Sequence, residues 1–206
     1  MHPSAQPSCR DRESTRRLGV PGLPQVSWGE HLCVFYRSKV ELLDLVVPFI
    51  RAGLEDHEFC MWVTGGPIQE GDAFRALERV MPDAHRYLAA RQLEIVPHTQ
   101  WYLTNGRFDT DKILQNWASR ADYTARRGFA GLRVTGNPFW LAHKTEWAAF
   151  DRYEGQVQQA IAHRPMIALC TYPTANCDPA QMLTTLRHHG ATLMPRGRAW
   201  KRIDLA

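Results

Sequence analysis

Short apolar runs alternate with helix-forming segments along most of this chain, and this alternation limits the folds that it can adopt. The runs contain apolar residues at successive positions, which is typical of strands buried on both faces of a parallel sheet. They lie at about 31–36, 58–64, 92–96, 131–136 and 166–172. The pattern predicts an α/β fold: a three-layer sandwich with a mostly parallel central sheet.

Helical periodicity fills the segments between these runs. Helices are predicted at about 39–54, 70–81, 83–90, 109–127, 144–162 and 179–189. Segment 191–204 is expected to add a hairpin at the edge of the sheet. Residues 1–26 are rich in Arg, Pro and Ser and have almost no apolar periodicity, which indicates a disordered tail. One folded domain is therefore expected over 27–206.

The turn after the first apolar run differs from a phosphate-binding loop. Such a loop needs glycines, followed by Lys and Ser or Thr at the start of the helix. This turn has no glycine, and Ser38 with Glu41 has the S-x-x-E spacing of a capping box. Glu41 would also repel a phosphate at the helix N-terminus. The strand, turn and helix look like the start of an ATPase-type fold from which ATP is excluded.

Composition and charge exclude several classes of function. The 206 residues carry a net charge of +4, and the Arg-rich clusters near both ends contain too few aromatics for a nucleic-acid surface. The five cysteines show no C-x-x-C spacing and mostly lie in apolar runs, which is typical of reduced cytosolic thiols. No signal-peptide or membrane-spanning stretch is present. We expect a cytoplasmic protein with no metal, no cofactor and no membrane contact.

Two aromatic-rich segments are the strongest signal for a binding site. Trp101, Tyr102 and Phe108 lie in a long loop predicted over 97–108, and Trp140 follows the fourth strand. In parallel sheets, ligands bind at the carboxyl ends of the strands, where both segments are expected. The aromatics favour an apolar pocket there, with packing over the sheet end as the alternative. G-x-S-x-G, H-E-x-x-H and Gly-rich phosphate motifs are all missing, so no enzyme is predicted.

Single polar residues in the apolar runs each allow a structural and a functional interpretation. His31 begins a buried strand, as a structural histidine or a ligand-binding one. Cys170 favours a buried thiol over a metal or redox site. Tyr172 either donates its hydroxyl to the pocket or simply ends its strand. Arg133 either forms an ion pair with Glu154 or Glu146 or orients a polar ligand group.

Motifs spread over about 28–203 carry a resemblance to a known family. They are HLCVFY at 31–36, PFIRAGL at 48–54, QLEI at 92–95, WY at 101–102, GRFD at 106–109, GLRVTG at 131–136, Trp140, YE at 153–154 and ALCTY at 168–172. In this order and spacing they resemble the MEDS domain, the sensory domain of methanogens, methylotrophs and dichloromethane-responsive regulators. Many relatives have an acidic residue where Asn137 stands, so a charge at that position is not expected here.

The resemblance implies a RecA-like fold without a phosphate loop and a non-enzymatic sensor of simple hydrocarbon derivatives. Relatives are often fused to a DNA-binding or kinase-like output module. No such module is recognisable here, so the resemblance implies a separate regulatory partner in signal transduction or transcription control. The ligand-binding candidates are His31, Tyr36, Trp101, Tyr102, Phe108, Arg133, Trp140, Glu154, Cys170 and Tyr172.

Two other functions fit the sequence. One is a degenerate RecA-like nucleotide-binding protein, which the missing Lys after the first strand disfavours. The other is a ligand-independent interaction module whose basic tail or C-terminal hairpin docks a partner.

Overall fold

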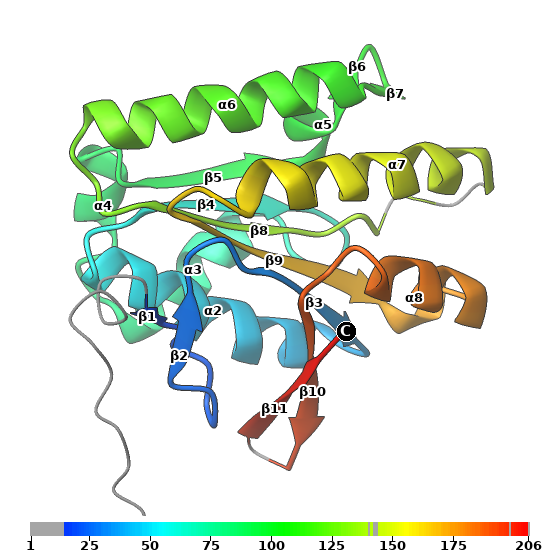
Figure 1. Ribbon diagram of the computed structural model, residues 1–206. Helices are drawn as coiled ribbons and strands as arrows, with labels where there is room; N and C mark the ends of the chain where they lie inside the picture. The colour runs from blue at the N-terminus through cyan, green and yellow to red at the C-terminus, as the bar shows by residue number, and fades with distance from the viewer. Residues whose placement is uncertain (1–14, 140, 142–143, 198, 206) are drawn as a thin grey trace, which may run out of the picture.

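A seven-stranded sheet forms the centre of the computed structural model, which describes residues 15–139, 141, 144–197 and 199–205. The strand order is β11-β10-β3-β9-β8-β4-β5 (Figure 1). Only β11 runs antiparallel, paired to β10, and the other neighbours in this sheet are parallel. The strands are β3 (His31–Tyr36), β4 (Phe59–Thr64), β5 (Leu93–Pro97), β8 (Leu132–Gly136), β9 (Met166–Pro173), β10 (Ala191–Arg196) and β11 (Ala199–Asp204).

Helices cover both faces of this sheet, which gives three layers (Figure 1). On one face lie α2 (Lys39–Glu55) and α3 (Glu70–Val80). On the other lie α6 (Thr110–Arg126), α7 (Lys144–Ile161) and α8 (Pro179–Leu186). Two short helices, α4 (His85–Ala89) and the 3-10 turn η1 (Thr174–Asn176), lie in connections. The predicted α/β architecture, the mostly parallel sheet and the C-terminal edge hairpin are confirmed.

Alternation along each strand sends successive side chains to different layers. In β9, Ala168 and Cys170 belong to the core beneath α7, whereas Ile167 and Leu169 belong to the core over α2. This two-residue period divides the polar residues of the strands between two separate cores. Only polar residues that face the same core can contact each other.

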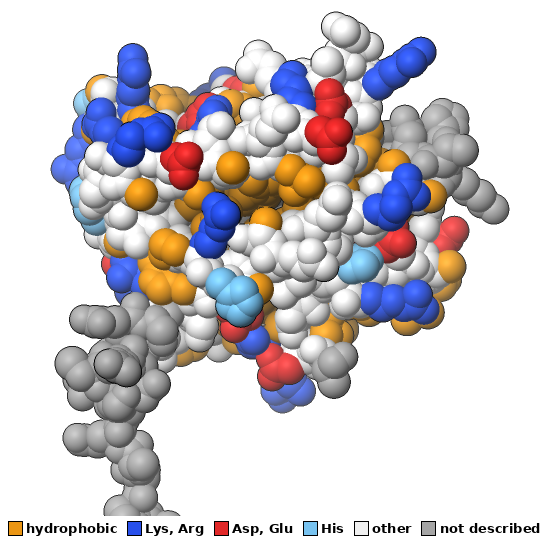
Figure 2. Space-filling model, turned by 45° about the horizontal axis from the view of Figure 1, so that its top comes forward, with side chains coloured by type: hydrophobic (Ala, Val, Ile, Leu, Met, Phe, Trp, Pro, Cys, Tyr) orange, Lys and Arg blue, Asp and Glu red, His pale blue; other side chains and the backbone are white. Residues whose placement is uncertain are grey.

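The α6 and α7 side is the face that Figure 2 views. Charged side chains of both signs are interspersed there, with hydrophobic side chains visible in a hollow near the centre (Figure 2). Mixed charges of this kind are typical of a solvated surface. Among the described residues, no helix is long and apolar enough to cross a membrane.

The N-terminal segment corrects the expected domain boundary. Residues 1–14 of the predicted disordered tail lie outside the described residues, but β1 (Thr15–Arg17) and β2 (Gln25–Ser27) form an antiparallel hairpin. Leu18 and Val20 between these strands are buried in the core over α2. The expectation of disorder to residue 26 was wrong, because contacts distant in sequence stabilise this segment and local periodicity does not report them.

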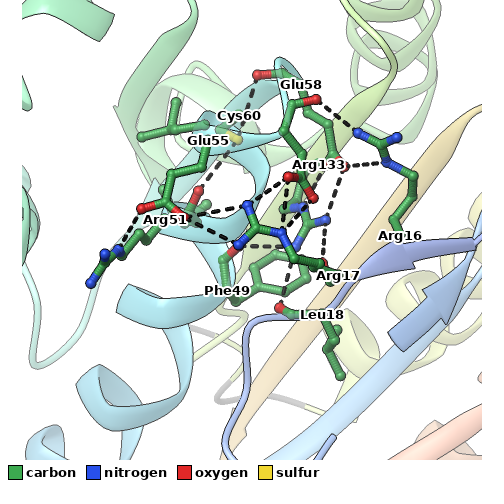
Figure 3. Close-up of polar contacts among 12 residues, drawn as sticks. Arg16, Arg17, Leu18, Phe49, Arg51, Glu55, Glu58, Cys60 and Arg133 are labelled. Carbon is green, nitrogen blue, oxygen red and sulfur yellow. Dashed lines mark hydrogen bonds and ion pairs between the residues drawn. The ribbon is translucent and has the colours of Figure 1, made fainter. Parts of the chain in front are cut away.

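A buried ion pair ties this hairpin to the sheet (Figure 3). Arg133 of β8 donates from Nε to Glu58 at 2.5 Å, and both side chains have no exposed surface. The same guanidinium donates to the backbone carbonyls of Arg17, Leu18 and Phe49. The expected pairing of Arg133 with Glu154 is therefore wrong, because Arg133 points into the core over α2.

Segment 97–108 also differs from the long loop that the sequence predicts. It folds as a short helix, α5 (His98–Trp101), followed by a hairpin of β6 (Leu103–Thr104) and β7 (Arg107–Phe108). Asn105 and Gly106 both have positive φ, 51° and 75°. An Asn-Gly pair with this backbone is the strongest short hairpin signal, and here it connects β6 to β7.

Candidate ligand site between the sheet and helices α7 and α8

Four polar side chains that are distant in sequence meet beneath α7. His31 is the first residue of β3, Cys170 lies in β9, Glu154 in α7, and His189 between α8 and β10. One donor atom of each lies within 4.8 Å of the others. His31, Glu154 and His189 are buried, and Cys170 keeps partial exposure. The site therefore lies inside the layer between sheet and helices, whereas the sequence predicted a site at the carboxyl edge of the sheet.

Both histidines of this cluster are oriented by backbone carbonyls. His31 Nδ1 lies 3.2 Å from the carbonyl oxygen of His188, and His189 Nδ1 lies 2.7 Å from that of Thr185. A carbonyl oxygen only accepts, so each Nδ1 carries the proton. The Nε2 atom of each neutral ring then presents a lone pair to the centre of the cluster.

The carboxylate of Glu154 faces these two lone pairs. Its Oε2 atom lies 3.4 Å from His31 Nε2 and 3.5 Å from His189 Nε2. Burial raises the pKa of Glu154 to about 8 and lowers the pKa of His31 to about 4. Burial also holds the pKa of His189 well below its usual value. Burial therefore favours the uncharged forms of all three side chains, with His31 and His189 as neutral imidazoles and Glu154 as a protonated carboxyl group.

Cys170 completes the cluster with a sulfur atom. Its Sγ lies 3.3 Å from His31 Nε2. Burial raises the pKa of the Cys170 thiol well above its ordinary value, and the neighbouring Glu154 raises it further. Cys33 pairs directly with Cys170 in the register of β3 and β9, but it does not belong to the cluster of four.

Aromatic rings form a wall around this polar cluster. Tyr172 lies 6.0 Å from the His189 ring, and Phe150 packs edge-on against Tyr172 at 6.3 Å. Phe108 contacts Tyr153 at 5.5 Å, and Tyr102 contacts Tyr153 at 6.4 Å. Segment 97–108 therefore places Tyr102 and Phe108 in this wall, inside the layer and away from the carboxyl edge of the sheet, and their role in ligand binding stays a prediction.

Several buried polar atoms of this region make no hydrogen bond of good geometry among the described residues, although Glu154 faces the Tyr172 hydroxyl and His31 faces the Gln158 side chain. They are Trp101 Nε1, Thr104 Oγ1, Glu154 Oε2, Gln158 Oε1, Tyr172 Oη and His189 Nε2. Native proteins leave few buried polar atoms unpaired, and each one needs an explanation such as a bound molecule or ion. Their concentration between the sheet and the helices on the α7 side marks this layer as the candidate site.

The structure separates the predicted site residues into two groups. It brings together His31, Tyr102, Glu154, Cys170 and Tyr172 near the polar cluster, with Phe108 in the aromatic wall. Trp101 is buried in the same core, and its ring centroid lies 5.8 Å from that of Trp117 in α6.

Three predicted site residues do not join this cluster. Arg133 and Tyr36 belong to the opposite face of the sheet. The Tyr36 hydroxyl accepts from Asn137 Nδ2 at 2.8 Å near the carboxyl edge of the sheet. Trp140 lies outside the described residues.

His189 is the residue that sequence reasoning missed. It lies two residues before β10, the strand that pairs with β3, and Gly190 N donates to the carbonyl of His31. Only the strand order places His189 beside His31. A His-His-Gly sequence ahead of a predicted edge strand was the available signal, and it was not used.

The turn after β3 is closed to phosphate. Ser38 Oγ accepts from the backbone N–H of Glu41 at 3.2 Å, as the capping-box spacing predicts. The Glu41 carboxylate accepts from the backbone N–H of Arg37 at 2.8 Å. Two N–H groups that could bind phosphate are therefore occupied, and a carboxylate lies at the positive end of α2.

Mg-ATP is accordingly expected to leave the thermal unfolding midpoint of the protein unchanged. Phosphate would have to displace the Glu41 carboxylate from the N–H of Arg37. Thermal unfolding with and without Mg-ATP checks this, with Glu41→Gln as the comparison. A raised midpoint for the unaltered protein would contradict the interpretation and support the nucleotide-binding alternative.

Comparison with known proteins first identifies the class of fold. The structure is similar to a KaiC-like protein, PH0186 from Pyrococcus horikoshii OT3, with a TM-score of 0.58, 15% sequence identity, and coverage of 91% of this chain and 85% of that one. The chain therefore has a KaiC-like, RecA-like fold.

The sequence then identifies the family. Residues 30–190 match the model of the MEDS domain, the methanogen/methylotroph, DcmR sensory domain, and the chain belongs to that family. It is also 26% identical over 183 residues to the transcriptional repressor DcmR of Methylorubrum extorquens. The aligned region covers 87% of this chain and 65% of that repressor, which is just under two thirds of its length.

Proposed function

We propose that this chain is the non-enzymatic, ligand-sensing part of a cytoplasmic regulatory system. It binds a small organic molecule between the sheet and helices α7 and α8 and signals to a regulatory partner, such as a DNA-binding output protein. Membership of the MEDS family supports a sensory role, and the repressor relative supports transcription control as the output. The group of buried, unpaired polar atoms behind an aromatic wall is the observation that carries the ligand site.

The chemistry of the layer suits a small molecule with an apolar body and one polar group. Rings of Phe108, Phe150 and Tyr153 supply apolar contact. The Tyr172 hydroxyl lies beside Glu154 and Cys170 without a hydrogen bond of good geometry, and it can donate to, or accept from, a polar group of the ligand. Sites for small molecules commonly combine an apolar lining with a few such polar groups.

A groove between α7 and α8 offers the route of entry. It has a volume of about 320 Å³, and Trp147 and Asp151 of α7 line it opposite Gln181 and Thr184 of α8. Glu154 lies about one helical turn beyond Asp151 on α7. The hydrogen bond between His188 Nε2 and Asp151 Oδ1, at 2.6 Å, joins α7 to the end of α8. A ligand that separates these helices would break that contact and change the surface that a partner recognises.

Short alcohols, halomethanes, methylamines and short carboxylic acids form the panel that tests the proposal. One class is expected to raise the thermal unfolding midpoint of the full chain. At about a hundred times its dissociation constant, a ligand adds roughly 2.7 kcal/mol, which corresponds to about 5–10 °C for a protein of this size. Differential scanning fluorimetry across the panel measures the shift.

Two matched hydroxyl deletions locate the site. Tyr172→Phe is expected to reduce the shift, because it removes the unpaired hydroxyl of the cluster. Tyr36→Phe is expected to preserve it, because that hydroxyl lies on the opposite face of the sheet. A shift that is kept with Tyr172→Phe and reduced with Tyr36→Phe would instead place the ligand site at the carboxyl edge of the sheet. No shift with any class would contradict the proposal and favour a ligand-independent interaction module.

A further inference from the structure

We propose that His31, Glu154, Cys170 and His189 bind a divalent transition-metal ion, with zinc as the best match. The donors are His31 Nε2, Glu154 Oε2, Cys170 Sγ and His189 Nε2. The inference goes beyond ligand sensing and does not depend on it, because these four side chains supply a complete set of donors by themselves.

The separations between the donor atoms match a tetrahedral site. Bond lengths to zinc of about 2.0–2.3 Å place neighbouring tetrahedral donors about 3.3–3.6 Å apart. The observed distances from His31 Nε2 are 3.3 Å to Cys170 Sγ and 3.4 Å to Glu154 Oε2. Glu154 Oε2 lies 3.5 Å from His189 Nε2. Three of the six edges of the expected tetrahedron are therefore present, and all four donor atoms lie within 4.8 Å of one another.

The outer contacts of both histidines are those of metal ligands. A metal-binding histidine typically donates its second ring N–H to a carbonyl or carboxylate, which fixes the tautomer and the ring orientation. His31 and His189 each direct Nδ1 to a backbone carbonyl, of His188 and Thr185 respectively. Both Nε2 lone pairs consequently point toward the same carboxylate and sulfur.

Two acceptor atoms at the centre make no hydrogen bond of good geometry, and one cation between them would satisfy both. Glu154 Oε2 and His189 Nε2 are these buried acceptors, and their residues are only 3% and 4% exposed. Such acceptors cost free energy unless a proton or a cation satisfies them. Two imidazoles, a thiolate and a carboxylate are borderline to soft donors, which suit zinc better than magnesium or calcium.

Four protein donors would make this a closed site with a structural role. The ion would join β3, β9, α7 and the turn between α8 and β10, which are the elements that hold the α7 side of the molecule together. No local metal motif is visible in the sequence because the four ligands come from four separate elements.

Metal content and cobalt spectroscopy of the full chain test the proposal. Purified protein, stripped with a chelator and dialysed against excess zinc, is expected to retain one zinc ion per chain by elemental analysis. Cobalt loading is expected to give the visible absorption of a tetrahedral complex and a near-ultraviolet thiolate-to-cobalt band. That band reports Cys170 in the unaltered protein, so this measurement does not depend on any variant folding.

Matched cysteine variants identify the sulfur ligand. Cys170→Ser is expected to abolish the thiolate band and to weaken zinc binding by about a hundredfold or more, since even outer contacts of metal ligands contribute 10–100-fold. Cys33→Ser and Cys177→Ser are expected to preserve the band, because neither residue belongs to the cluster. Glu154→Gln is expected to weaken binding and keep the band.

Two results would overturn the proposal. One is a stripped protein that retains no stoichiometric zinc or cobalt, which would mean that protons alone satisfy the cluster. The other is a cobalt complex without the thiolate band, or one whose band is lost with Cys33→Ser or Cys177→Ser and kept with Cys170→Ser. Circular dichroism of each variant separates loss of binding from loss of folding.

Discussion

Glu58→Gln is expected to lower the free energy of unfolding by about 3–5 kcal/mol, which is the usual cost of removing one partner from a buried ion pair. Arg133 has no exposed surface, and Glu58 is the carboxylate to which its Nε and Nη2 donate. Without that carboxylate, the guanidinium keeps only neutral acceptors, which are the backbone carbonyls of Arg17, Leu18 and Phe49 and one glutamine amide oxygen. The buried cation would then lack a compensating charge.

Glu55→Gln is the matched control for this prediction. Glu55 pairs with Arg17 and Arg51 at distances of 3.3 and 2.7 Å, but its side chain is 31% exposed. Exposed pairs of this kind contribute about 0–1 kcal/mol. Urea unfolding of both variants measures the difference. A loss below about 1 kcal/mol for Glu58→Gln would show that Arg133 does not depend on this partner.

The double variant Glu58→Gln/Arg133→Met tests whether the loss of stability comes from an unpaired buried charge or from lost packing of the two side chains. Replacing both partners removes the unpaired charge, so the double variant is expected to be more stable than Glu58→Gln alone. An additive loss would instead mean that each side chain is needed for its packing.

Local patterns predicted the elements well because each element is specified by its own residues. The apolar runs at 58–64 and 166–172 became central strands, and the parallel sheet followed from their two-sided burial. The cap at Ser38 formed as its spacing predicted. Local information of this kind reaches three or four residues, which is the range of capping and helical periodicity.

The candidate site was harder to predict because strand order and register decide which residues meet. Arg133 and Val134 are neighbours in sequence, yet they face opposite cores. The sequence shows that alternate residues of β8 face opposite sides of the sheet. It does not show which of the two sets faces α2 and which faces α7. His189 joined His31 only because β10 pairs with β3, a pairing between segments more than 150 residues apart.

The N-terminal hairpin shows a third kind of limit. The family match begins at residue 30, whereas the structure shows β1 from Thr15 and buried Leu18. Arg16 donates to Glu58 at 3.0 Å, and the backbone carbonyls of Arg17 and Leu18 accept from Arg133. A segment with few apolar residues is thus held by hydrogen bonds to Glu58 and Arg133, which are charged residues of the core. No pattern within 1–26 predicts these contacts.

Gly19→Ala tests whether this hairpin is part of the folded unit, and it is expected to lower the free energy of unfolding by about 2–5 kcal/mol. Gly19 has φ of 82°, which costs a residue with a side chain about 1–2 kcal/mol. An added Cβ would also meet the backbone carbonyl oxygen of Pro48 and would lie 2.6 Å from Ala52 Cβ in α2. Overpacking against a helix backbone typically costs a further 1–3 kcal/mol.

Gly106→Ala is the matched control, because it has the backbone cost of positive φ without the overpacking cost. Gly106 has φ of 75°, and nothing lies within 4 Å of an added Cβ, so only the backbone term of about 1–2 kcal/mol applies. Urea unfolding is therefore expected to show a clearly larger loss for Gly19→Ala than for Gly106→Ala. Equal losses would mean that the hairpin does not pack on α2 in solution. A larger loss at Gly19 would extend the folded unit of this MEDS domain to the N-terminal side of the residues that match the family, and variants designed to test ligand or metal binding would then have to retain this hairpin.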